Sequence, residues 1–151
     1  MKRIITPKTA FWLYKAAFPI YIFSALYITL IDRIPKNRRT QLTPFWELRR
    51  LIETDHTLYW LGQISGNLVM LLPLGIMLPV ICRNLRCGWK VVLIGFAFSL
   101  AIELVQYFTG RGLCEFDDVM HNTIGTFLGY LIFPKFWEIL TGEKLETVNI
   151  G

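Results

Sequence analysis

The chain has 151 residues, of which 54% are hydrophobic and only 18% are charged, whereas a soluble domain usually carries about 25% charged residues. This composition indicates an integral membrane protein and excludes a globule with an aqueous coat. The formal net charge of +5 fits basic loops that meet anionic headgroups. Because the basic residues flank apolar segments, the sequence predicts no nucleic-acid partner.

Four apolar segments predict an all-α integral membrane fold with four transmembrane helices in a compact bundle. The predicted spans cover about residues 11–31, 64–81, 91–109 and 118–133. Each is close to the ~20 residues that a helix needs to cross the bilayer, although the fourth is short. We expect a single domain over residues 1–151 that ends in a polar tail over residues 141–151.

The long connection after the first span, Asp32–Gln63, is polar and contains a predicted short amphipathic helix. Thr43 suits the N-cap of this helix and Pro44 its first helical position. One face carries Phe45, Leu48, Leu51 and Ile52, and the residues away from it are Glu47, Arg49 and Arg50. Such a helix either lies in the membrane interface or covers the mouth of the bundle. A packed loop helix without a ligand is the favoured interpretation.

Polar side chains interrupt the later spans. A carboxylate at the centre of a span, such as Glu103, costs about 2.5 to 3.5 kcal/mol and therefore faces a partner or a cavity. Ser99 and Gln106 share its stripe because they are spaced at i, i+4 and i+7. In the fourth span Asp118 and Asn122 follow a similar spacing, and Asn67 lies one turn into the second span.

The short connection Gly110–Asp117 should bring these groups together near one membrane face, where Arg111 is expected to neutralise one or two carboxylates. We therefore predict a ligand-binding or functional polar cluster made of Asn67, Glu103, Gln106, Arg111, Asp117, Asp118 and Asn122. The alternative is a purely structural network that only holds the bundle together.

Small residues predict where helices approach closely. Gly125 and Gly129 form a GxxxG pattern that lets a neighbouring backbone come near, and Pro73 with Gly75 marks a kink or a close crossing. Oxygen ligands from this region would favour Mg²⁺ or Ca²⁺, and the candidates are Glu103, Asp117, Asp118 and His121. No compact metal or nucleophile motif supports such a site, so no metal, cofactor or catalytic residue is predicted.

The ordered polar residues resemble those of the VanZ-like family of small integral membrane proteins, which is named for a protein of low-level teicoplanin resistance. The pattern runs from about Asn67 to Phe133 and reads Asn67-x5-Pro73-Leu74-Gly75, Glu103-x2-Gln106, Arg111, and Asp118-x3-Asn122-Thr123-x-Gly125-x3-Gly129-Tyr130. Leu71 departs from it, since the family more often has an aromatic residue there.

The resemblance implies a multi-pass protein of the plasma membrane with both termini in the cytoplasm and no established enzymatic activity. Basic residues alone do not orient it, because similar numbers flank the two sides. The leading hypothesis is low-level glycopeptide (teicoplanin) resistance through a polar pocket near the outer face. That pocket would bind the drug, a lipid headgroup or a cell-wall precursor.

The alternatives are a small oligomeric lipid transporter or flippase, a membrane hydrolase or transferase, and a structural bundle. The partners left open by the sequence are membrane lipids, a cell-wall precursor or glycopeptide, and a second copy of the chain.

Overall fold

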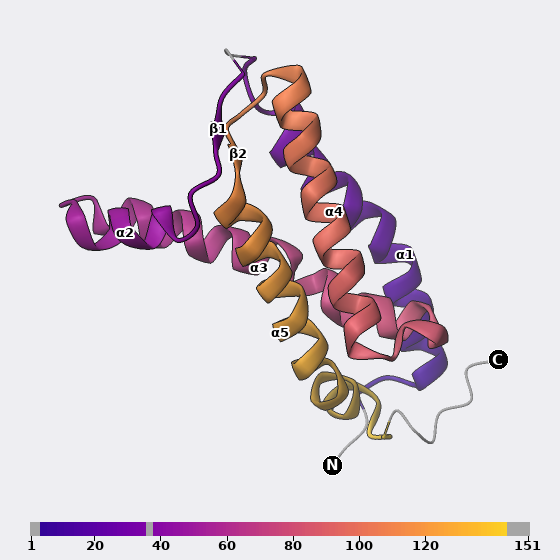
Figure 1. Cartoon of the computed structure of the whole chain (residues 1–151). Helices are drawn as coiled ribbons and strands as arrows, with labels where there is room; N and C mark the ends of the chain where they lie inside the picture. The colour runs from indigo at the N-terminus through magenta and orange to yellow at the C-terminus, as the bar shows by residue number, and fades with distance from the viewer. Residues whose placement is uncertain (1–3, 36–37, 145–151) are drawn as a thin grey trace.

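The computed structural model describes residues 4–35 and 38–144, and these are almost entirely helical (Figure 1). The α-helices are α1 (Pro7–Leu26), α2 (Trp46–Glu53), α3 (Thr57–Ile81), α4 (Gly88–Thr109) and α5 (Phe116–Thr141). A π-helical turn, Tyr27–Ile31, extends α1, and a 3-10 turn, Arg83–Leu85, follows α3. Two short strands, β1 (Thr40–Gln41) and β2 (Cys114–Glu115), complete the described elements. The fold is therefore all-α, apart from one small pairing of strands.

Three helices within residues 4–35 and 38–144 are long and apolar enough to cross a membrane: Pro7–Ile31, Thr57–Ile81 and Gly88–Thr109. The fourth predicted span lies in α5, which is not among them. This helix is longer than the expected 118–133, and it includes Asp117 and Asp118 in its first turn and Lys135 and Glu138 near its end. The second predicted span also lengthens, since α3 begins at Thr57. Most of the predicted polar tail lies outside the described residues.

Apolar side chains cover the outside of the bundle, and its interior contains polar side chains as well as apolar ones. Phe108 is 63% exposed and Leu93 is 53% exposed, both on α4. Ser99 and Gln106 of the same helix are buried, as is Thr126 of α5. Large exposed apolar side chains around buried polar ones suit a protein whose surroundings are lipid.

Helices α3 and α5 pack with their backbones in close contact. A Cβ at Gly125 would collide with the carbonyl oxygen of Leu68, and one at Gly129 with that of Leu72. From the other side, a Cβ at Gly75 would collide with the Thr126 carbonyl oxygen. The predicted glycine pattern therefore joins two helices of the same chain, which places α5 firmly against α3.

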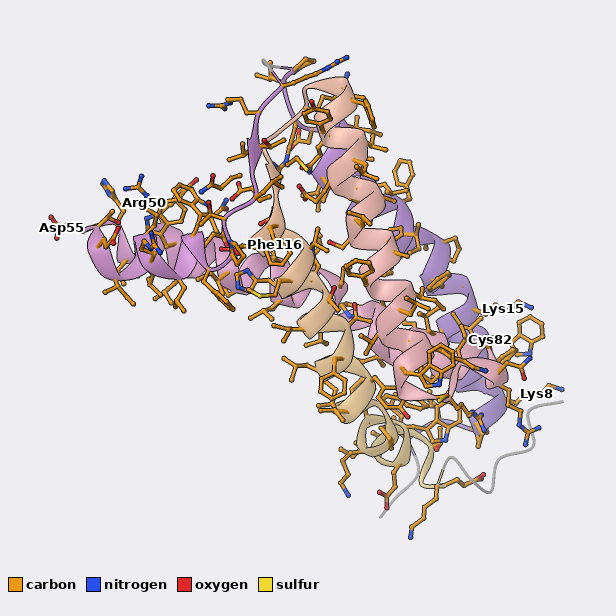
Figure 2. All side chains as sticks on the ribbon, viewed as in Figure 1. Lys8, Lys15, Arg50, Asp55, Cys82 and Phe116 are labelled. Carbon is orange, nitrogen blue, oxygen red and sulfur yellow. The ribbon has the colours of Figure 1, made fainter. Side chains whose placement is uncertain are left out.

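One end of the bundle is closed by contacts between the beginning and the end of the described chain. The backbone N–H groups of Ile4 and Ile5 donate to the carbonyl oxygen of Leu140 at 3.1 and 3.0 Å. Ala10 packs there with Val80 and with the buried ring of Trp137. Figure 2 shows Lys8 and Lys15 near this end, away from Arg50 and Asp55.

At the opposite end, helix α2 projects from the bundle (Figure 1), and the segment before it is tied to the α4–α5 connection. Strand β1 pairs in parallel with β2, with Thr40 opposite Cys114 and Gln41 opposite Glu115. The N–H of Cys114 also donates to the carbonyl oxygen of Arg39 at 3.1 Å. This pairing brings the long first connection to the start of α5.

Candidate functional site

The short helix α2 is held by a carboxylate of α5. The backbone N–H of Phe45 donates to Asp117 Oδ1 at 2.7 Å, and that of Glu47 donates to Oδ2 at 2.9 Å. Asp117 therefore satisfies two free donors at the beginning of α2, as an N-cap side chain would, and its charge suits the positive end of the helix dipole. Because this cap comes from α5, the helix begins at Trp46, and the expected N-cap at Thr43 is wrong. Phe45 is the N-cap residue, with a left-handed φ of 59°.

Helix α2 turns its apolar residues outward and one carboxylate inward. Phe45 and Ile52 are 57% and 78% exposed, whereas Glu47 is only 1% exposed. Glu47 Oε2 lies 3.1 Å from Nδ1 of His121 on α5, which makes an ion pair when the imidazole is protonated. Glu47 Oε1 is buried and has no hydrogen-bond partner among the described residues. The amphipathic helix thus places the carboxylate of Glu47 inside the bundle.

Three carboxylates meet where α2, β2 and α5 come together. Each of Glu47, Glu115 and Asp118 offers one oxygen, and these oxygens all lie within 4.8 Å of one another. We call these three residues the acid cluster. Asp118 accepts a hydrogen bond from Nδ2 of Asn67 on α3, and Glu115 Oε2 accepts one from the indole Nε1 of Trp46 at 2.9 Å.

Below the acid cluster, the polar residues of α4 bond to neighbouring elements. Glu103 Oε2 accepts a hydrogen bond from the backbone N–H of Glu115 at 2.8 Å, and so fixes the beginning of α5. Gln106 Nε2 donates to the Thr29 carbonyl oxygen at 3.1 Å. Asn122 Nδ2 donates to the hydroxyl of Ser99 at 2.8 Å.

The prediction that Arg111 neutralises one or two carboxylates is wrong. Its guanidinium donates to the carbonyl oxygens of Leu30 and Ile31 at 3.1 and 3.2 Å, and the described part of the chain shows no ion pair between Arg111 and Glu103. The physical reason is the π-helical turn, which leaves carbonyl oxygens at its end that need donors. Arg111 therefore caps that turn.

Other arginines line two adjoining pockets at this end of the molecule. The first, of about 570 Å³, is lined by Arg39, Thr40, Gln41, Trp46, Arg50 and Leu113. The second, of about 330 Å³, is lined by Asp32, Arg33, Ile34, Arg39, Gly112 and Leu113. They share Arg39 and Leu113, and Trp46 connects the first to the acid cluster through its bond to Glu115. We call them the arginine pockets.

Burial and neighbouring charges shift the pKa of Glu115, which lies in β2 just before α5. Burial raises the pKa of its carboxyl above the ordinary value. The hydrogen bond from Trp46 lowers it, the carboxylates of Glu47 and Asp117 raise it, and the charge of Arg33 lowers it. Negative charge thus gathers here, and Arg33 is one cation close enough to oppose it.

The structure brings five of the predicted site residues into the region of the acid cluster or directly beneath it: Asn67, Glu103, Asp117, Asp118 and Asn122. Gln106 and Arg111 bind the turn after α1 instead. Sequence reasoning missed Glu47, Glu115, Arg33, Arg39 and Arg50 as site residues. The only signal for Glu47 was its position on the polar side of α2, and the strand pairing that places the arginines has no sequence signature.

Comparison with known proteins identifies the family of the chain. The family model described as VanZ/LLP1 matches residues 11–139. Protein VanZ of Enterococcus faecium is 26% identical over 88 residues, which cover 58% of this chain and 54% of that protein. The match thus spans about half the length of that relative, and no solved structure matches the chain. On the strength of the family match, which covers most of its length, the chain belongs to the VanZ/LLP1 family.

Proposed function

We propose that this protein is a multi-pass plasma-membrane protein that gives low-level protection against teicoplanin-type glycopeptides by binding an anionic headgroup in the arginine pockets. The observation that carries the proposal is the convergence of Arg33, Arg39 and Arg50 on two adjoining pockets. The anionic group is a phosphate or carboxylate of a membrane lipid, a cell-wall precursor or the drug itself.

Arginine suits this task because its planar guanidinium binds phosphate and carboxylate groups through two parallel hydrogen bonds. The pocket volumes of about 570 and 330 Å³ fall in the range of small-molecule sites. Trp46 adds an aromatic wall to the larger pocket, and Arg50 lies 5.0 Å from its ring centroid. The lining thus combines charge for a headgroup with apolar surface for its attachment.

The exposed apolar residues of α2 support a position at the membrane surface. Phe45, Leu48 and Ile52 are all exposed, and lipid would cover them if α2 lay in the interface. With both termini in the cytoplasm, α4 would run outward and the loop that carries Leu113 would face the outside. That orientation makes the arginine pockets accessible to an external drug or to a precursor in the outer leaflet.

Drug susceptibility provides the direct test in cells. A strain that expresses the protein should need a higher inhibitory concentration of teicoplanin than a matched strain without it. Arg39→Gln should lose this protection, whereas the control Arg38→Gln, which removes the neighbouring charge outside both pockets, should keep it. Equal susceptibility of all strains at equal expression would refute the resistance role.

Binding to purified ligands separates the role in resistance from the headgroup chemistry. Vesicles of anionic lipid, a purified lipid-linked precursor and teicoplanin each test one source of the anionic group. Loss of one charge-assisted hydrogen bond at an exposed arginine should cost about 1 to 2 kcal/mol, a factor of roughly 5 to 30 in affinity. If Arg39→Gln binds all three ligands as well as wild type does, the pockets are not the binding site.

The alternative of an oligomeric transporter gains no support from the fold. The GxxxG pair Gly125 and Gly129, which could otherwise contact a second copy, packs against α3 of the same chain.

A further inference from the structure

We propose that the acid cluster, formed by Glu47, Glu115 and Asp118, binds one divalent metal cation at the junction of α2, β2 and α5. The inference concerns a site that differs from the arginine pockets in charge and chemistry. It also stands independently of any role in drug resistance.

The spacing of the three carboxylates suits a hard cation. Their nearest oxygens lie within 4.8 Å of one another. Two oxygens on opposite sides of Ca²⁺ are separated by at most about 5 Å, because each bond is about 2.3 to 2.6 Å long, whereas around Mg²⁺ the separation is about 4 Å. The limit of 4.8 Å is closer to the span of oxygens around Ca²⁺ than to that around Mg²⁺, and a small inward movement of the three side chains would bring all of them to Ca²⁺ bonding distance. Carboxylate oxygens are also the ligands that such cations prefer over softer metals.

One buried carboxylate oxygen of the cluster has no protein partner. Glu47 is 1% exposed, and its Oε1 has no hydrogen-bond partner within the described residues. Burial of a charged oxygen is costly unless a donor or a cation replaces its hydration. Because an oxygen of Glu47 faces those of Glu115 and Asp118, a cation between them would supply the missing interaction.

The balance of charge leads to the same conclusion. Two more carboxylates lie close to the acid cluster. Asp117 and Glu103 each accept hydrogen bonds there from backbone N–H groups. His121 faces Glu47, and the charge of Arg33 acts on Glu115. A divalent ion between the three carboxylates of the cluster would reduce the repulsion among them. Water would fill the remaining positions of a shell of six to eight ligands.

Terbium luminescence tests this site on the full-length protein in detergent. Tb³⁺ is close to Ca²⁺ in radius, and its emission is excited by an indole nearby. Trp46 meets this requirement because its Nε1 bonds to Glu115 Oε2 at 2.9 Å. We expect saturable emission that Ca²⁺ abolishes by competition. The double variant Trp46→Phe, Trp60→Phe should remove most of the emission, because the Trp60 ring centroid lies 5.4 Å from that of Trp46. Trp89→Phe should not, since Trp89 lies 14 residues from Glu103, about 21 Å along α4.

Variants of the carboxylates then locate the site. Glu47→Gln and Asp118→Asn should each weaken Tb³⁺ and Ca²⁺ binding by more than about tenfold, the loss that even an outer-shell partner causes. Glu53→Gln, the same change on the exposed side of α2, should leave affinity unchanged. Equal binding by Glu47→Gln and wild type, or an equal loss in Glu53→Gln, would overturn the assignment.

A measurement on the wild-type protein decides the matter even if a variant fails to fold. Ca²⁺ should raise the melting temperature of the wild type in a saturable way, because the folded state alone assembles the three ligands. No rise in melting temperature, together with terbium emission that does not saturate, would refute the site.

Discussion

Replacing Asp117 by alanine should release α2 from the bundle while α3, α4 and α5 stay folded. Asp117 is 1% exposed and accepts hydrogen bonds from Phe45 N–H at 2.7 Å and Glu47 N–H at 2.9 Å. The main packing of α5, on α3 through glycines, lies further along the helix. The substitution thus removes the cap of α2 and leaves the bundle interface in place.

The size of the effect follows from these two bonds. A hydrogen bond to a charged group contributes about 1.5 to 3 kcal/mol, and the helix dipole adds up to about 1 kcal/mol. Against this, removal of one carboxylate relieves repulsion on Glu47, Glu115 and Asp118. We therefore expect a net loss of about 2 to 4 kcal/mol in the local stability of α2, a factor of roughly 30 to 700 in its opening equilibrium.

Amide hydrogen exchange measures this opening residue by residue. The amides of Phe45 and Glu47 should exchange faster in Asp117→Ala by that factor, and Asp117→Asn, which keeps one acceptor oxygen, should give an intermediate result. Asp55→Ala, an exposed aspartate just after α2, is the control and should change neither amide. Unaltered exchange at Phe45 and Glu47 in Asp117→Ala would refute the capping role.

Two further predictions follow from the packing and from the ends of α4. Gly125→Ala should lower the melting temperature in detergent, because the added Cβ would collide with the Leu68 carbonyl oxygen. Such overpacking costs about 1 to 3 kcal/mol. The control Gly62→Ala, with open space around the added Cβ, should be neutral or up to about 1 kcal/mol stabilising. Equal effects of the two changes would contradict the close approach of α3 and α5. A membrane-impermeant thiol reagent applied to intact cells should modify Cys114 and spare Cys87, since they lie beyond opposite ends of α4; the reverse pattern would invert the proposed orientation.

The sequence by itself determined the helical membrane fold and the inward stripe of α4. Hydrocarbon offers no partner for backbone N–H and C=O groups, so long apolar segments form helices, which satisfy these groups within the segment. Ser99, Glu103 and Gln106 share one face through their spacing, and all three are buried. The glycine pattern of α5 likewise predicted a close helix contact, although it did not name α3 as the partner.

Only the tertiary structure decided which way α2 faces and which donors meet which acceptors. Periodicity defines the apolar face of a helix, but lipid is as apolar as a protein core, so this face can point either way. Asp117 settles the direction by binding the two N–H groups at the start of α2, and Glu47 turns inward as a result. The partners of Arg111 could not be predicted from the sequence either, because they are carbonyl oxygens at the end of a turn some 80 residues earlier in the chain. Such contacts depend on which polar groups folding leaves unsatisfied, and that is a property of the assembled bundle.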